Sequence, residues 1–103
     1  MAHKSRLEFQ KLLEHLLGSR NVYFQPPSSI KMSYPAIKYD LTRLENTFAN
    51  NAVYQQNTAY EVIVIDKNPD SEIVKRISSL PLCRWLRHYT ADNLNHDVFV
   101  LYF

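Results

Sequence analysis

The chain has 103 residues, of which 46% are hydrophobic and 21% are charged, and its formal net charge is +2. These values indicate one globular domain over residues 1–103 and exclude a disordered chain. The small net charge gives no general attraction for nucleic acid. The single cysteine, Cys83, excludes an internal disulfide and suits a reducing compartment. We expect no membrane segment and no signal peptide, because no apolar run has the required length.

Residues 5–18, SRLEFQKLLEHLLG, carry the clearest helical pattern. Ser5 and Glu8 form a capping box at the start of this segment. Gly18 suits a left-handed C-cap at its end. Apolar residues recur at helical spacing and predict one buried stripe, formed by Phe9, Leu12, Leu13, Leu16 and Leu17.

Strand-like patterns and chain breakers follow the first helix. Residues 21–25 are aromatic and β-prone, whereas residues 26–35 contain three prolines and predict an extended loop. Residues 36–44 alternate apolar and polar side chains, which predicts a strand with one dry face. The side chains expected on that face are Ile37, Tyr39 and Leu41.

The middle of the chain changes from polar to strongly apolar. Residues 45–57 are rich in asparagine and predict a connection or extended hairpin arm, with Phe48 and Tyr54 as anchors. Residues 58–66 predict the most buried strand, because residues 62–65 are continuously apolar and β-branched.

Residues 68–81 predict a second, shorter helix. Asn68 or Asp70 can cap it, and Pro69 suits the first helical position if Asn68 is the cap. Pro81 ends the segment. The expected inner stripe is Ile73, Ile77 and Leu80.

Two more strands are predicted at residues 83–89 and 97–103, and we expect them to pair as an antiparallel hairpin. The element order is therefore α-β-β-β-α-β-β. This order indicates an α+β fold in which two amphipathic helices pack on a mainly antiparallel sheet.

The last strand, DVFVLYF, is apolar on both faces. A half-buried strand would be polar on one side. We therefore expect the first helix to cover the face of Phe99, Leu101 and Phe103. The face of Val98, Val100 and Tyr102 should meet another subunit or the connecting arm.

The stretch DNLNHD, residues 92–97, gathers polar side chains that could carry chemistry. His96 and Asp97 are adjacent, so on a strand they point to opposite faces and cannot share an ion without a bend. Asp92 could join His96, with His88 across the hairpin. Zinc sites have denser Cys and His spacing, so we expect no metal and no cofactor.

Catalytic patterns are equally weak. Cys83 follows an apolar run and predicts a buried, inert thiol. A single glycine excludes a P-loop and a dinucleotide fingerprint. We expect no enzyme; the remaining catalytic hypothesis pairs His96 with Asp92 or Asp97 as acid and base.

The segment 84–89 interleaves cations with aromatic rings, as nucleic-acid stacking surfaces do. A binding domain that uses Arg84, Arg87 and Tyr89 is the alternative from a different class. Alternation instead places Cys83, Trp85 and Tyr89 on one face, which we expect to be core, with Arg84 and His88 on the other. We expect no specific nucleic-acid binding.

These patterns favour a protein that binds other proteins. Asn93 and Asn95 suit a turn that Asp97 caps, and the same loop could give hydrogen bonds across an interface. The candidate interface residues are Arg84, Arg87, Asp92, Asn93, Asn95, His96, Asp97, Phe48 and Tyr54.

Three stretches carry a family resemblance: YFQPPSSIKMSYPAIKY, YEVIVIDKNPDSEIVKRISSLPLCRW and RHYTADNLNHDVFVLYF. They resemble small structural proteins from the head–tail joining region of long-tailed bacteriophages, called tail-completion or tail-terminator proteins. The order of elements is also similar to the tail-terminator fold.

The resemblance implies a virion protein that assembles in the host cytoplasm as a ring, usually hexameric. Such a ring closes the head-proximal end of the tail tube and joins the tail to the head. The implied partners are other copies of the chain, the tail tube protein and a neck or connector protein. The chain is shorter than many terminators, so a neck or head-closure role between portal and tail is an alternative. A head-closure protein would be more purely β, and two helices disfavour it.

Overall fold

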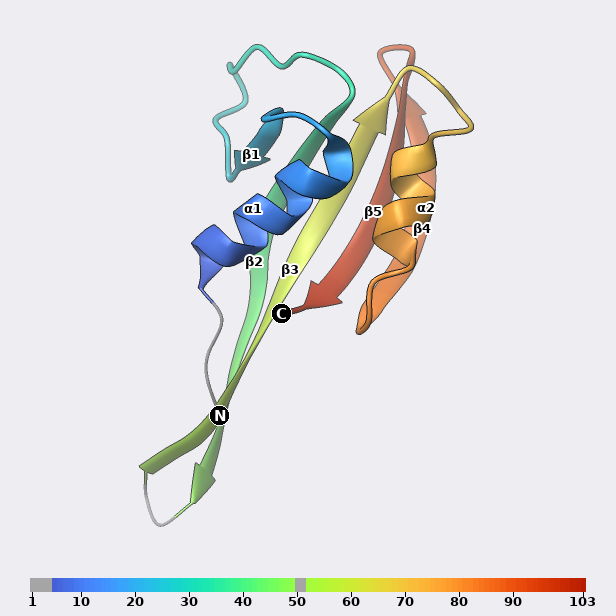
Figure 1. Ribbon diagram of the computed structural model, residues 1–103. Coiled ribbons are helices and arrows are strands. Elements are labelled where there is room, and N and C mark those ends of the chain that lie inside the picture. The colour runs from blue at the N-terminus through green and yellow to red at the C-terminus, as the bar shows by residue number, and fades with distance from the viewer. Residues whose placement is uncertain (1–4, 50–51) are drawn as a thin grey trace.

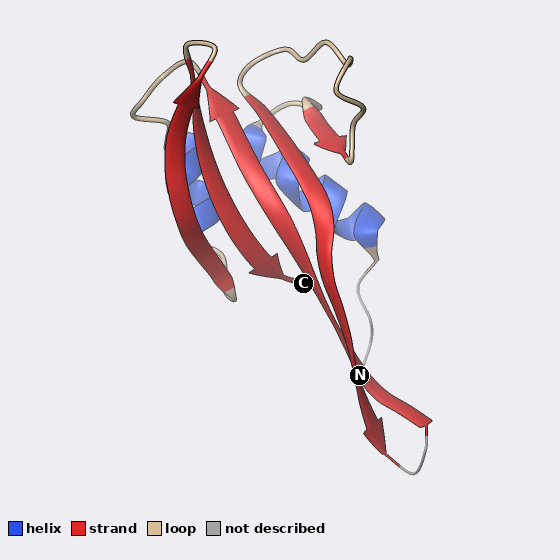
Figure 2. Cartoon of the chain, turned by 180° about the vertical axis from the view of Figure 1, so that it is seen from behind, coloured by secondary structure: helices blue, strands red, loops and turns tan. Residues whose placement is uncertain are grey.

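The computed structural model describes residues 5–49 and 52–103, without the side chains of 45–49 and 52–56. Two helices lie on one face of a five-stranded sheet of order β1-β2-β3-β5-β4 (Figures 1 and 2). The elements are α1 (Arg6–Leu17), β1 (Val22–Phe24), β2 (Ala36–Ala49), β3 (Ala52–Asp66), α2 (Glu72–Ser78), β4 (Cys83–Ala91) and β5 (Leu94–Tyr102). The predicted α+β class and the order α-β-β-β-α-β-β are confirmed. All strand pairs are antiparallel except β1 with β2.

Helix α1 begins and ends where its sequence signals predict. The Ser5 hydroxyl accepts a hydrogen bond from the Glu8 amide, which satisfies one of the free amides of the first turn. Gly18 ends the helix in the left-handed conformation, with φ of 82°, and its amide donates to the carbonyl of Glu14. A residue with a Cβ is strained at this φ, so glycine is the residue that fits.

Helix α2 is shorter than predicted, and its cap lies elsewhere. Ser71 is the N-cap and accepts from the amide of Ile73. The prediction of a cap at Asn68 or Asp70, with Pro69 at the first helical position, is wrong. Asp66 and Asn68 instead accept from the amides two residues ahead, which uses these side chains in the preceding turn.

The main core lies between the helices and the sheet. Phe9 of α1 is fully buried, stacks on Tyr60 with ring centroids 4.6 Å apart, and meets Tyr39 edge-on at 5.3 Å. The other buried members are Leu13, Leu17, Val22, Ile37, Val62, Val64, Ile73, Ile77, Phe99 and Leu101. The predicted stripes of both helices thus face the sheet, with Leu12, Leu16 and Leu80 partly buried at the margin.

Two irregularities interrupt the pairing of β2 and β3, between Leu41 and Arg43 and between Thr47 and Phe48. Ile37 and Tyr39 are buried as predicted, but Leu41 is 46% exposed. The prediction for Leu41 is wrong: β1 ends opposite Tyr39, so no strand lies beside β2 at Leu41 on that edge.

Strands β2 and β3 continue past the sheet as a two-stranded arm, which Figure 1 shows projecting from the body. The ladder runs from Ala36↔Ile65 to Ala49↔Ala52, whereas β5 accompanies β3 only from Ala59 onward. The molecule measures 52 × 27 × 22 Å because of this arm. The predicted hairpin arm is therefore present.

The two faces of β5 are covered differently. Phe99 and Leu101 are buried in the core cluster, which contains residues of both helices. The Phe103 ring lies 4.9 Å from that of Phe9 in α1, as predicted. On the other face, Val98 is buried with Ile63 and Ile65, and Met32 of the proline-rich loop and Leu94 pack against this group. Farther along that face, Val100 and Tyr102 are half-buried.

Candidate functional site

We call the sheet face opposite the helices the open face. Strand register places Asp40, Glu61, Val100 and Arg84 across it, on four neighbouring strands. Lys38 and Asp40 form an ion pair of 3.8 Å on this face. The open face therefore presents a mixture of apolar and charged side chains, with the proline-rich loop covering one end.

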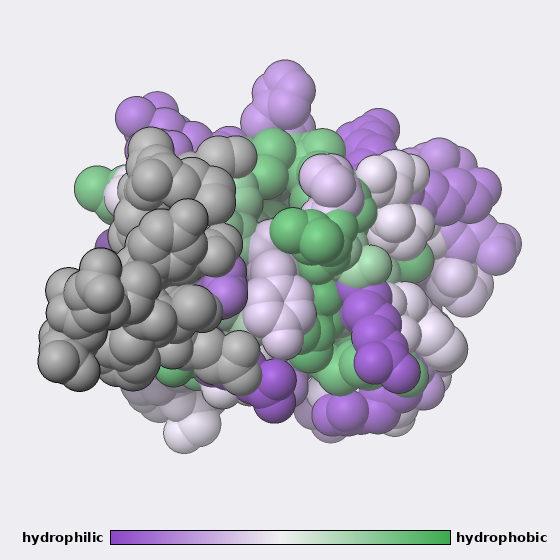
Figure 3. All heavy atoms as spheres, turned by 90° about the horizontal axis from the view of Figure 1, so that it is seen from below, coloured by the Kyte–Doolittle hydropathy of each residue, from purple (hydrophilic) through white to green (hydrophobic). Residues whose placement is uncertain are grey.

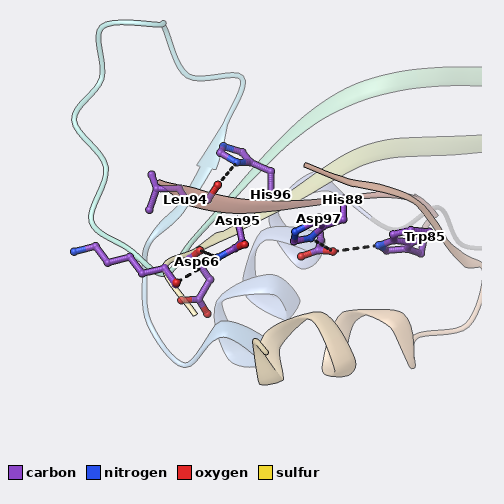
Figure 4. A network of polar contacts seen from close by, with 8 residues as sticks. Asp66, Trp85, His88, Leu94, Asn95, His96 and Asp97 are labelled. Carbon is purple, nitrogen blue, oxygen red and sulfur yellow. Dashed lines mark hydrogen bonds and ion pairs between the residues drawn. The ribbon is translucent and has the colours of Figure 1, made fainter. Parts of the chain in front are cut away.

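Asp97 lies on the helix-covered face and not in a solvent-exposed loop. Its carboxylate Oδ1 accepts from Trp85 Nε1 at 3.2 Å and lies 3.0 Å from His88 Nδ1 (Figure 4). Because a carboxylate accepts, this arrangement places the proton of the His88 ring on Nδ1. Asp97 is buried and therefore needs these partners. The prediction that Asp97 caps a turn is wrong.

His96 points to the opposite face from Asp97, as alternation predicts (Figure 4). Its ring stacks on that of Tyr89 with centroids 4.6 Å apart and planes 10° from parallel. The Arg87 guanidinium lies 5.9 Å from the Tyr89 ring centroid. His96 Nδ1 also lies 3.1 Å from the carbonyl of Leu94. His96 and Asp97 therefore cannot act as an acid–base pair in this geometry.

The turn between β4 and β5 is made by Asp92 and Asn93, both in the left-handed conformation with φ of 54° and 63°. Asp and Asn tolerate this conformation better than other non-glycine residues. Asn95 belongs to β5 instead, and its side-chain amide donates to the carbonyls of Asp66 and Lys67. Asn93 was correctly predicted in the turn, whereas Asn95 ties the hairpin to the β3–α2 loop.

An irregularity in β4 between Trp85 and Arg87 overturns the predicted faces of this strand. Trp85 pairs with Phe99 on the helix-covered face, whereas Tyr89 pairs with His96 on the open face. Both are exposed, at 51% and 39%, so their predicted place in the core is wrong. The extra residue, Leu86, shifts the alternation by one.

The same shift brings two predicted interface residues together. Arg84 and Arg87 are three apart and would face opposite sides in a regular strand. In β4 they pair with Val100 and Val98, two residues apart on β5, so both arginines project from the open face. Both are exposed.

A groove of about 470 Å³ hollows the open face beside Arg84. Leu82, Leu86, Val100 and Tyr102 contribute to its walls. Figure 3, seen from below, shows apolar side chains gathered at this end of the molecule among polar ones. Sequence reasoning missed Leu82 and Leu86, because an exposed leucine has the same pattern as a buried one.

The remaining predicted residues are less informative. Phe48 and Tyr54 lie in the arm, outside the described side chains. Cys83 is partly buried, and burial raises the pKa of its thiol, which agrees with an inert cysteine. Within residues 5–49 and 52–103, no three His, Cys, Asp or Glu side chains come together as a metal site.

Neither described helix has the length and apolar content needed to cross a membrane. The chain matches no protein-family model, and no curated protein matches it.

Proposed function

We propose that this chain is a structural protein of a phage virion that forms a hexameric ring at the head-proximal end of the tail tube. The ring stops growth of the tube and offers a docking face for the head or neck. Support comes from the three motif stretches and from the α-β-β-β-α-β-β order with both helices on one face of the sheet.

The arm of β2 and β3 is the observation that carries this proposal. After residue 40 in β2 and before residue 59 in β3, these strands pair only with each other in the described ladders. A lone two-stranded hairpin is marginally stable in water, and free strand edges invite pairing with other chains. A neighbouring subunit in a ring would cover the arm and remove both problems.

The first test measures assembly by light scattering and negative-stain images, for the chain alone and mixed with tail tube protein. We expect rings and tubes with one capped end. Replacing residues 47–55 by Asn-Gly closes a two-residue hairpin across the Asn46↔Gln56 pair. This shortened variant should keep the melting temperature of the body and lose the rings.

The second test is genetic. A phage that lacks the protein should make overlong tails that fail to join heads. Normal tails with leaking heads would instead support the neck or head-closure alternative. Normal tails that join heads would refute both roles.

A nucleic-acid-binding domain is the second candidate, and one observation favours it. Tyr89 is exposed, stacks on His96 and lies near Arg87, so the aromatic and basic side chains share an accessible surface. Binding to short oligonucleotides should then weaken steeply with added salt, because phosphate contacts release counterions. Absence of binding at low salt would eliminate this candidate.

A further inference from the structure

We propose that the groove on the open face binds an extended segment of another protein that carries aliphatic side chains and carboxylates. Residues where β4 starts and β5 ends line the groove. Figure 2 shows the sheet from the face that neither helix covers. This inference does not require the ring, because the groove is formed within one chain.

Leu82 gives the first reason to assign binding to this groove. It is 74% exposed and has a φ of 58°, in the left-handed region. A leucine in this conformation is strained, and asparagine or glycine would fit better. An exposed apolar side chain on a strained backbone gives the isolated chain no packing energy. A partner that buries Leu82 explains why leucine stands there.

The second reason is the chemistry of the groove walls. Leu82, Leu86 and Val100 provide aliphatic surface, and the Tyr102 hydroxyl accepts from Arg43 Nη1 at 3.4 Å. Such walls suit aliphatic side chains of a peptide. Nucleic-acid bases bind to stacked aromatic platforms, and the Tyr89–His96 pair is not among the residues that line this groove.

Charge gives the third reason and selects the partner. Arg84 lines the groove and is exposed, and none of the described lining residues carries a carboxyl group. Glu61 is in register with Val100 on the open face but lies outside the lining and forms no described ion pair with Arg84. A carboxylate on the bound segment would therefore meet the guanidinium of Arg84. A second copy docked groove to groove would instead place arginine against arginine.

The test uses the full chain, labelled with ¹⁵N, and a short peptide of alternating leucine and glutamate. Amide shifts should move at residues 82–86 and 100–102 as the peptide is added. Two control probes of similar length are tested in the same way: a peptide of alternating leucine and lysine, and a single-stranded oligothymidylate. Neither should produce the same shifts.

Two variants decide between groove binding and general charge attraction. Arg84→Glu should weaken binding of the Leu–Glu peptide at least about tenfold, because a carboxylate then faces carboxylates. Arg20→Glu, at an exposed position before β1, makes the same charge change away from the groove and should leave binding unaltered. Leu82→Asn should raise the melting temperature and weaken binding.

Several outcomes would overturn the proposal. These are no shifts with the Leu–Glu peptide, equal binding by Arg84→Glu, or binding by Leu82→Asn at full strength. Preferential binding of oligothymidylate would assign the surface to nucleic acid instead. Ring formation is measured separately, so failure of the ring and failure of the groove are distinguishable.

Discussion

Strands β4 and β5 have two faces that serve different purposes. On the helix-covered face, Phe99 and Leu101 are almost completely buried, and Asp97 has two hydrogen-bond partners. On the open face, Leu86 is 38% exposed and Arg84 projects into solvent. The same hairpin therefore completes the core with one face and leaves the other available for contact. Stability should depend on the first face, and binding on the second.

The largest expected effect compares two leucines on opposite faces. Leu101→Ala should destabilise the fold by about 2–5 kcal/mol, because it leaves a cavity in the core between the helices and the sheet. Leu86→Ala removes the same atoms from the open face and should cost less than about 1 kcal/mol. Urea unfolding of both variants gives the two free energies. Equal losses of stability would show that Leu86 belongs to the core, and would contradict the division between a stabilising face and a binding face.

A middle-sized effect is expected at Asp97. Asp97→Ala removes the acceptor for Trp85 and His88, and this should cost about 1–3 kcal/mol. Asp70→Ala, at an exposed position before α2, is the matched control and should change stability by less than about 0.5 kcal/mol. Thermal unfolding with tryptophan fluorescence follows both stability and the environment of Trp85. A loss of stability as small as that of the control would show that Asp97 does not stabilise the helix-covered face.

The smallest expected effect is a pH dependence on the helix-covered face. Burial raises the pKa of Tyr39 above its ordinary value of 10.0, although the nearby Arg6 opposes the shift. The folded state then holds this proton more tightly than the unfolded state. Stability from this group is complete below pH 10 and falls as the pH rises through the folded pKa.

Tyr39→Phe tests this pH dependence. The variant loses hydrogen bonds to Gln10 and Arg6 and should be less stable by about 0.5–1.5 kcal/mol at neutral pH. Its stability should fall less steeply above pH 10 than that of the wild type. The remaining slope includes Tyr60, whose pKa burial also raises. Unfolding measured at several pH values gives both slopes, and parallel curves would contradict the prediction.

Much of the fold was predictable because local signals and packing agreed. In α1, the Ser5 cap, the apolar stripe and Gly18 all indicated the same helix, and the structure contains it. In β5, alternation correctly placed Phe99 and Leu101 on the buried face, in the core between the helices and the sheet. These are positions where one face of an element is buried by its own chain, so the sequence pattern is strong.

The candidate site was harder to predict because one residue changes the phase of a strand. An extra residue at Leu86 leaves Trp85 on one face and moves Tyr89 to the other. Strict alternation cannot include such a bulge. Trp85 is also exposed because β4 is an edge strand and the nearby helix α2 has only seven residues. The strained backbone at Leu82 could not be predicted, because leucine is unusual at positive φ and therefore does not indicate that conformation.

The arm has a consequence for how such a protein can vary. Because β2 and β3 pair only with each other there, residues can be added or removed without repacking the body. Adding two residues to each strand keeps every side chain on its face and extends the reach by roughly 7 Å. Adding one residue to each strand would turn the outer side chains over. The reach of the arm can therefore evolve in discrete steps, so that one body could serve assemblies of different dimensions.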